Sequence, residues 1–306
     1  LDLRGNPGGL LPQAIEVVSR FVPGGQTVVS VKGRSRYATT EDMLSTSGKN
    51  HDFPLVVMIN GGSASASEIV AGAIQDYARG VVVGTDSFGK GLVQRVFPLP
   101  YGTGLTLTMA RYYTPFGRSL QRDYSNGSIY EYYSHSDTGE VDGKPKPVGE
   151  AVTTANGRVL YGGRGIEPDV TAKPVEGTTL RFRVNEAAFF FTRQLVAGKI
   201  AGLENYKIEK QDHRQSFPAD TLQINDKLFE AFRQYAVSSK DSGLSAENIT
   251  ALSDHARTRV REELATATHS NEAGIQVLLE VDPQVQKALE SMTEAKRLSQ
   301  QTIAKK

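Results

Sequence analysis

The chain has 306 residues and contains neither cysteine nor tryptophan. The absence of cysteine excludes disulfides, thiolate metal sites and a cysteine nucleophile. It leaves the compartment open, because chains without disulfides occur in reducing and oxidising compartments alike. An excess of charge of one sign is also lacking, since 35 lysines and arginines face 34 aspartates and glutamates. No whole-chain field therefore favours nucleic acid or an anionic membrane as a partner.

Long hydrophobic runs are missing too. No stretch approaches the roughly 18 apolar residues of a membrane span, and no signal peptide precedes the first residue. A content of 39% hydrophobic and 23% charged residues is usual for a globular protein. Residue 1 is leucine, and residues 1–4 resemble the end of a buried strand. We therefore expect a fragment whose upstream domains and targeting signal are missing.

The first half of the chain alternates short β-branched runs with helical patterns. Strands are predicted at residues 28–32, 55–60, 81–84, 92–97 and 105–110. Helical spacing of apolar residues marks residues 10–21 and 68–77. This alternation predicts a layered α/β core. Residues 117–150 carry glycine, proline and serine without a sustained period, which indicates a long surface insertion.

The last third of the chain is rich in residues that favour helices. We predict helices at residues 185–196, 226–238, 245–267, 273–280 and 283–300. The predicted organisation is a core over residues 1–174 and a helical C-terminal extension over residues 175–306. Glu262 and Glu263 are interpreted as part of a solvated helix face. The histidines and acidic residues show no metal-ligand spacing, so no metal site is predicted.

A run of small residues, 60–68, follows a predicted strand and leads directly into a helix. Small side chains allow a sharp turn and close approach of a substrate. A serine at such a turn presents its hydroxyl near helix N-terminal amides, which can hold a developing oxyanion. Ser65 is the candidate. The alternative is structural, because Ser65 and Glu68 also fit a helix capping box.

A lysine bracketed by glycines, Lys90, lies 25 residues further on. Residues 84–90 fit the start of a phosphate-binding P-loop. However, Gly91 stands where a serine or threonine should hold magnesium. The residues that follow predict a strand, whereas a P-loop must lead into a helix. A nucleotide-binding function is therefore the weaker alternative.

A serine nucleophile needs a base, and the five histidines lie in no recognisable motif. Lysine can be that base only when it is neutral, and an ordinary lysine is almost fully protonated at pH 7. The role therefore requires a desolvated site, which Phe88 and the flanking apolar strands would provide. Gln94 offers an uncharged amide that can orient the amine.

Five motifs in one order resemble the C-terminal processing peptidases, also called tail-specific proteases. They are residues 1–9 (LDLRGNPGG), 62–68 (GSASASE), 87–91 (SFGKG) with Gln94, 112–121 (YYTPFGRSLQ) and 165–169 (GIEPD). The resemblance covers residues 1 to about 170. It implies a crotonase-like α/β protease core that needs no cofactor and cuts proteins near their carboxyl termini.

The same resemblance implies the site residues. Ser65 falls on the nucleophile, Lys90 on the general base and Gln94 on the residue that orients it. The oxyanion hole would combine the amide of Ala66 with one from the opening turn, where Gly8 is preferred and Gly9 is the alternative. Ser63 and Ser67 are neighbours of the nucleophile, and Asp2 with Arg4 is interpreted as a structural ion pair.

The expected partners are protein or peptide substrates with accessible C-termini, and not nucleic acid. A homo-oligomer or a regulatory partner would use the helical C-terminal region. The family resemblance places the intact protein outside the cytoplasm, in a periplasm or at a membrane through the missing signal. The family usually carries an upstream PDZ domain, and nothing here corresponds to one. A catalytically silent scaffold that binds protein tails is the remaining alternative.

Overall fold

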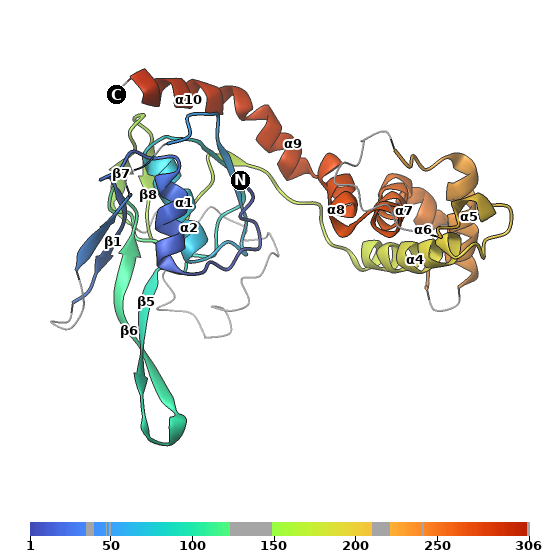
Figure 1. The fold of residues 1–306 in the computed structure, drawn as a ribbon, viewed down its shortest axis with the longest axis horizontal. Coiled ribbons are helices and arrows are strands. Elements are labelled where there is room, and N and C mark those ends of the chain that lie inside the picture. Colours follow the sequence, from blue (N-terminus) through green and yellow to red (C-terminus); the bar gives the residue numbers. More distant parts are fainter. Residues whose placement is uncertain are drawn as a thin grey trace. The chain divides into compact units, whose positions relative to one another are not determined.

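A computed structural model describes residues 1–34, 40–46, 48, 50–122, 149–209, 221–239 and 242–304. The chain divides into two compact units. The first contains residues 1–173 and 287–306, and the second contains residues 174–286. Figure 1 shows strands in the first unit and helices in the second. Each unit is described separately below.

The centre of the first unit is a parallel sheet in the order β3 (Val56–Ile59), β4 (Val81–Gly84), β9 (Val170–Thr171). The start of the chain adds to it, because Asp2 forms a parallel bridge with Met58. Every residue of β3 and β4 is buried. Continuous burial is typical of a parallel sheet that is covered on both faces.

An antiparallel sheet lies in the same unit, in the order β2, β1, β6, β5. Its strands are β1 (Thr27–Lys32), β2 (Glu41–Leu44), β5 (Leu92–Pro98) and β6 (Gly104–Tyr113). A short helix, η1 (Pro100–Gly102), connects β5 to β6 at the tip of their hairpin. A small separate hairpin pairs β7 (Ala151–Thr153) with β8 (Val159–Tyr161).

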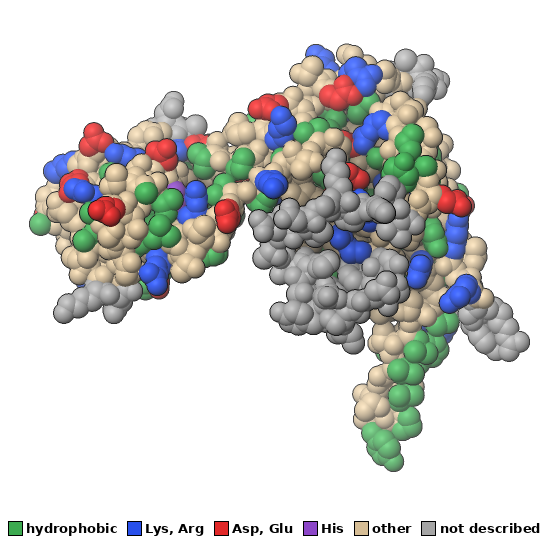
Figure 2. Space-filling model, turned by 180° about the vertical axis from the view of Figure 1, so that it is seen from behind, with side chains coloured by type: hydrophobic (Ala, Val, Ile, Leu, Met, Phe, Trp, Pro, Cys, Tyr) green, Lys and Arg blue, Asp and Glu red, His purple; other side chains and the backbone are tan. Residues whose placement is uncertain are grey.

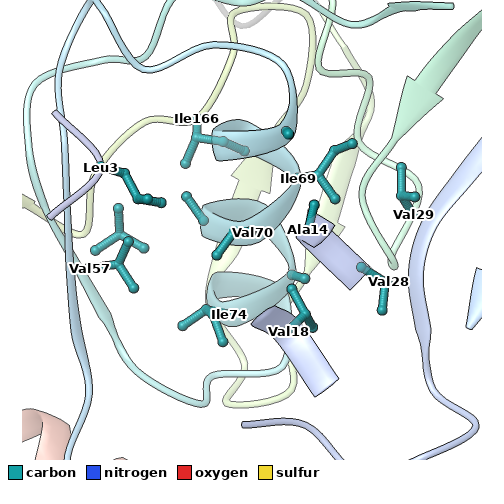
Figure 3. Close-up of a cluster of buried hydrophobic side chains, with 14 of the residues drawn as sticks. Leu3, Ala14, Val18, Val28, Val29, Val57, Ile69, Val70, Ile74 and Ile166 are labelled. Atoms are coloured by element: carbon teal, nitrogen blue, oxygen red, sulfur yellow. The ribbon is translucent and has the colours of Figure 1, made fainter. Parts of the chain in front are cut away.

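Helix α2 (Ala66–Asp76) packs beside the parallel sheet, and α1 (Leu11–Ser19) packs against α2. All eleven residues of α2 are buried, as expected for a helix enclosed in the core. Ile69, Val70 and Ile74 of α2 belong to one apolar cluster with Val57 of β3 and Val18 of α1 (Figure 3). This enclosure fixes the N-terminal end of α2, where the serine cluster lies.

The second unit is built from helices. They are α4 (Thr179–Val196), η2 (Glu204–Tyr206), α5 (Asp226–Ser238), α6 (Ala246–Ala251), α7 (Ser253–Thr268) and α8 (Asn271–Glu280). The fully buried rings of Phe191 and Phe232 pack edge to face in its core, with centroids 5.5 Å apart. Side-chain caps mark several helix starts, for example Asn225, whose side chain accepts from Leu228 N. The last helices of the chain are α9 (Pro283–Glu290) and α10 (Met292–Ala304).

The structure confirms an α/β fold and all five predicted strands, to within a few residues. Two predictions of single helices are wrong. The segment 245–267 breaks at Leu252, whose ψ of 27° leaves the helical range, and 283–300 breaks at Ser291. The Ser291 hydroxyl donates to the Lys287 carbonyl at 2.8 Å, a bond that bends helices. The predicted insertion at 117–150 lies mostly outside the described residues.

Candidate active site

Ser65 is the residue immediately before α2, and its backbone is unusual. Its φ of 55° and ψ of −114° place a non-glycine residue in a sparsely populated region. The surrounding structure must enforce such a conformation, and strain of this kind clusters at functional sites. The geometry is that of a strand-to-helix turn that presents a hydroxyl at the head of a helix. Ser65 itself is partly exposed.

The opening turn of the chain is bonded to this serine turn by side-chain hydroxyls. The fully buried Ser63 donates through Oγ to the Leu3 carbonyl at 2.7 Å. Ser67 Oγ donates to the Asn6 carbonyl at 3.0 Å, and Ala64 N donates to the same carbonyl at 3.0 Å. Ser63 and Ser67 therefore hold the two turns together.

Gly8 lies directly against the serine turn. A Cβ at Gly8 would come within 2.7 Å of the Ala64 carbonyl oxygen, 2.8 Å of Ala66 N and 2.9 Å of Ser65 Cβ. Its φ of 98° also favours glycine. The close approach thus brings the backbone of the opening turn beside the head of α2.

Three amides near Ser65 differ in their hydrogen bonding. Gly8 N donates to the Asn6 side chain at 2.9 Å. Within the described part of the chain, the amides of Gly9 and Ala66 have no hydrogen-bond acceptor. Backbone amides without acceptors are suited to bind an oxyanion.

The lysine loop connects β4 to β5 and is fixed through its backbone. Phe88 N donates to the Ser63 carbonyl at 3.0 Å, and Ser87 N donates to the Ile166 carbonyl at 3.0 Å. Lys90 is half-buried. Within the described residues its amine has no hydrogen-bonding or ionic partner. A strand follows Lys90, so the loop lacks the helix that a P-loop requires.

A buried carboxylate, Glu68 of α2, joins the serine turn to the lysine loop. Its Oε2 accepts from Ser65 N and Lys90 N, both at 2.8 Å. Its Oε1 accepts from Ser87 Oγ at 2.5 Å and Gly89 N at 2.7 Å. Burial raises the pKa of Glu68, whereas these hydrogen bonds act in the opposite direction.

Gln94 lies on β5, beside a bulge between Val93 and itself. Its side chain is exposed and, in the portion of the chain that is described, contacts neither Lys90 nor Ser65 through a hydrogen bond. The structure thus brings together the turn regions of Ser65, Gly8, Ala66 and Lys90. It leaves Gln94 outside that hydrogen-bonded group.

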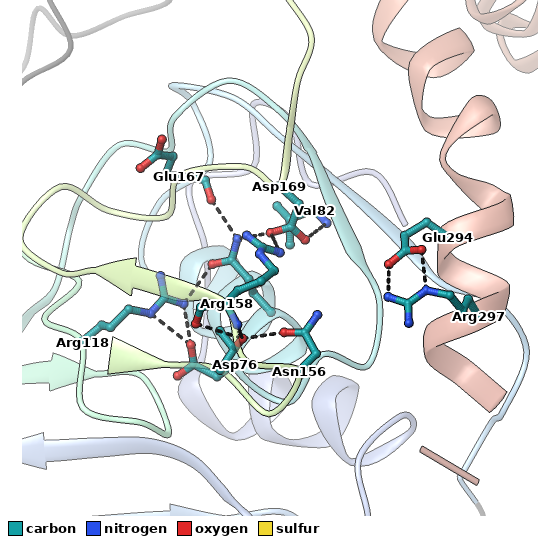
Figure 4. Close-up of polar contacts among 11 residues, drawn as sticks. Asp76, Val82, Arg118, Asn156, Arg158, Glu167, Asp169, Glu294 and Arg297 are labelled. Atoms are coloured by element: carbon teal, nitrogen blue, oxygen red, sulfur yellow. Dashed lines mark hydrogen bonds and ion pairs between the residues drawn. The ribbon is translucent and has the colours of Figure 1, made fainter. Parts of the chain in front are cut away.

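Asp2 and Arg4 form the expected ion pair, at 2.8 Å between Oδ2 and NH2. A second pair is buried at the other end of α2, where Arg118 contacts Asp76 at 2.6 Å (Figure 4). Arg118 also donates to Gln75 at 2.9 Å. This network attaches the turn that follows β6 to α2. Phe116 N donates to Asp76 as well, at 3.0 Å.

Glu68 is the residue whose role the sequence did not reveal. The S-x-x-E pattern did predict its contact with the Ser65 amide, as half of a capping box. Its contacts with Ser87, Gly89 and Lys90 depend on the tertiary fold. Burial of a glutamate with no surface exposed is the structural signal that identifies it.

A strained serine at the head of a buried helix, with unpaired amides beside it, has a geometry that suits a serine nucleophile. Residues 1–127 match the sequence model of peptidase family S41. The resemblance to the C-terminal processing peptidases is therefore confirmed.

Two relatives illustrate the match. A carboxy-terminal-processing protease of Bartonella bacilliformis is 52% identical over 125 residues, which cover 40% of this chain and 28% of the relative. A carboxyl-terminal-processing protease of Synechocystis is 46% identical over 115 residues, covering 38% of this chain and 26% of the relative. The matched region thus spans about a quarter of these relatives.

A solved photosystem II D1 C-terminal processing protease is similar at 29% identity, with a TM-score of 0.39. That alignment covers 56% of this chain and 33% of the other. Across the helices that are described, none combines the length and apolar character needed to cross a membrane.

Proposed function

We propose that residues 1–173 form part of a serine endopeptidase that cuts protein substrates near their carboxyl termini. The observation that carries the proposal is the strained Ser65 at the head of α2, joined through Glu68 to the backbone of Lys90. The names of the S41 relatives, which describe carboxyl-terminal processing, support the substrate class.

In the proposed reaction Lys90 is the general base. Its neutral amine removes the proton of Ser65 Oγ while that oxygen attacks the scissile carbonyl carbon. The resulting ammonium gives the proton to the leaving amine as the carbon–nitrogen bond breaks. The same amine then deprotonates a water that hydrolyses the acyl-enzyme ester. Gln94 is proposed to orient the amine once substrate is bound.

The proposed oxyanion hole combines the Ala66 amide with an amide of the opening turn. Gly9 is favoured over Gly8 because the Gly8 amide already donates to Asn6. Gly8 then has a different function, which is to let the turn approach Ser65 closely. In this arrangement the negative charge of the tetrahedral intermediate lies at the N-terminal end of α2, where the helix dipole stabilises it.

Three further features implied by the resemblance belong to the same proposal. They are crotonase-like layering of the core, action outside the cytoplasm, and a partner or second copy bound through the helical second unit. Relatives named as chloroplastic processing peptidases support a location outside the cytoplasm.

Labelling with a fluorophosphonate probe tests the nucleophile. We expect the chain to be labelled at Ser65 and Ser65→Ala to lose labelling completely, since no other serine occupies the strained turn. Ser63→Ala is the matched control, because Ser63 holds the opening turn and should keep measurable labelling. Labelling of Ser65→Ala at the parental rate would exclude Ser65 as nucleophile. If the parent chain is not labelled, the result favours the alternative function, a catalytically silent scaffold that binds protein tails.

A further inference from the structure

The proposed reaction makes no use of the side chain of Glu68, although this carboxylate lies at the centre of the site. It has no exposed surface. Within the described residues it forms no ion pair, so four neutral donors provide all of its stabilisation. Removing a buried carboxylate from water costs several kcal/mol unless its oxygens are fully hydrogen-bonded. A function that depends on the charge would explain why it is there.

The hydrogen bonds around Glu68 suit an ionised carboxylate. Ser87 Oγ accepts from Ile166 N at 2.7 Å and donates to Glu68 Oε1 at 2.5 Å. The other three donors are backbone amides, which cannot accept a proton. Four donors on the two oxygens favour the anion, whereas burial raises the pKa of the carboxyl group.

The anion connects two segments that come from different parts of the sequence. Since Ser65 N and Lys90 N each lie 2.8 Å from the same oxygen, the two nitrogens are within twice that distance of one another. A further hydrogen bond between these segments joins Phe88 N to the Ser63 carbonyl. Gly165 closes the space beside the carboxylate, because a Cβ there would lie 2.8 Å from Glu68 Oε1.

We propose that Glu68 is a positioning residue of the peptidase reaction, because its carboxylate holds the amides of Ser65 and Lys90 on one oxygen and so sets the separation of nucleophile and base. The inference rests on the proposed function. It predicts that loss of the anion slows the chemical step and leaves substrate binding nearly unchanged.

The test compares Glu68→Gln and Ser87→Ala with the parent chain. In Glu68→Gln an NH2 group replaces one of the two carboxylate oxygens. That group is a hydrogen-bond donor, and it faces groups that are themselves donors. We expect the rate of fluorophosphonate labelling and the kcat for an unstructured peptide to fall about a hundredfold, with KM within about twofold. Ser87→Ala removes one of the four donors and should lower both rates about tenfold.

Asn225→Ala is the control, because the Asn225 side chain also accepts from a backbone amide at a helix start but lies in the second unit. It should lower the melting temperature and leave labelling at the parental rate. If the role of Glu68 were purely structural, Glu68→Gln would behave in the same way, with a lower melting temperature and labelling at the parental rate. Folded Glu68→Gln that labels at the parental rate would thus overturn the inference. If Glu68→Gln does not fold, parental labelling of Ser87→Ala overturns it instead. An unlabelled parent would refute the proposed function, and the inference with it.

Discussion

Ser65 shows how a single residue can be held in a conformation that it would not adopt alone. Such backbone strain costs on the order of 1–3 kcal/mol. Around Ser65, the cost is offset by contacts of its neighbours: the Ser63 and Ser67 hydroxyls, the close packing of Gly8, and the Glu68 carboxylate on the Ser65 amide. Part of the local stability is therefore offset by the strain that positions the Ser65 hydroxyl.

Lys90→Arg separates a basic role of Lys90 from an electrostatic one. Arginine keeps the positive charge and the donors but cannot lose its proton at accessible pH. We expect kcat/KM on an unstructured protein substrate to fall by more than about a hundredfold. Gln94→Ala is the companion variant and should be milder, since it removes only the orienting amide. Retention of more than about a tenth of parental kcat/KM by Lys90→Arg would exclude lysine as the base.

At the scale of elements, periodicity and turn chemistry predicted most of the first unit. Strands β3 and β4 of the parallel sheet are nearly continuous apolar runs, so their limits could be predicted to within a residue or two. β2 was missed because its segment, Glu41–Leu44, is short and mostly exposed, and β9 was missed because it has only two residues. The break at Ser291 depends on one hydroxyl that bonds a carbonyl within its own helix. The periodicity of apolar residues does not predict such a hydrogen bond.

In the candidate site, as in the fold, local features could be predicted from the sequence. The small-residue run and the glycine-bracketed lysine identified the two turns because each pattern is local. The roles of Ser65, Lys90, Gln94 and the turn glycines remain predictions. The link through Glu68 could not be predicted, because it depends on how distant segments meet. The hydrogen bond from the Gly8 amide to the Asn6 side chain is local, two residues apart, and was missed because the turn was not recognised as an Asx turn.

Helix α7 corrects the interpretation of Glu262 and Glu263 as a solvated face, since their side chains are only 15% and 16% exposed. Arg259 lies 3.3 Å from Glu262 and 3.6 Å from Glu263. Burial, and then repulsion from Glu262, raises the pKa of Glu263 to about 7. Helical periodicity alone cannot distinguish this partly buried face from a solvated one.

The raised pKa of Glu263 makes the stability of the second unit depend on pH. Because the folded state binds the proton more tightly than the unfolded chain, stability falls as pH rises from about 4.5 to about 7 and then levels off. Glu263→Gln should flatten much of this fall and raise the melting temperature at pH 8 by a few degrees. Thermal unfolding followed by circular dichroism at several pH values measures it. Identical pH profiles for the parent and Glu263→Gln would contradict the assignment.

For the whole molecule, the division into units does not follow the order of the chain. Residues 287–306 belong to the first unit although the second unit precedes them. In α10, Ala295 is fully buried and Leu298 is 4% exposed. The last segment therefore contributes buried apolar side chains to the first unit.

Leu298→Ala tests this assignment. Removing a buried leucine side chain costs about 3 kcal/mol, and we expect the loss in the first unit alone. Hydrogen exchange should accelerate for amides of β3 and β4 and stay unchanged in α5. Leu264→Ala, in the core of the second unit, is the matched control and should show the reverse. Faster exchange in α5 alone for Leu298→Ala would show that α10 stabilises the second unit instead.

The return of α10 to the first unit has a consequence for biosynthesis. During synthesis residues 1–173 precede the second unit, and the last helix assigned to the first unit follows it. N-terminal domains commonly fold during translation. Here the contacts of α10 with the rest of the first unit can form only after residues 174–286 have been made, so the first unit cannot complete its folding before the second unit has been synthesised.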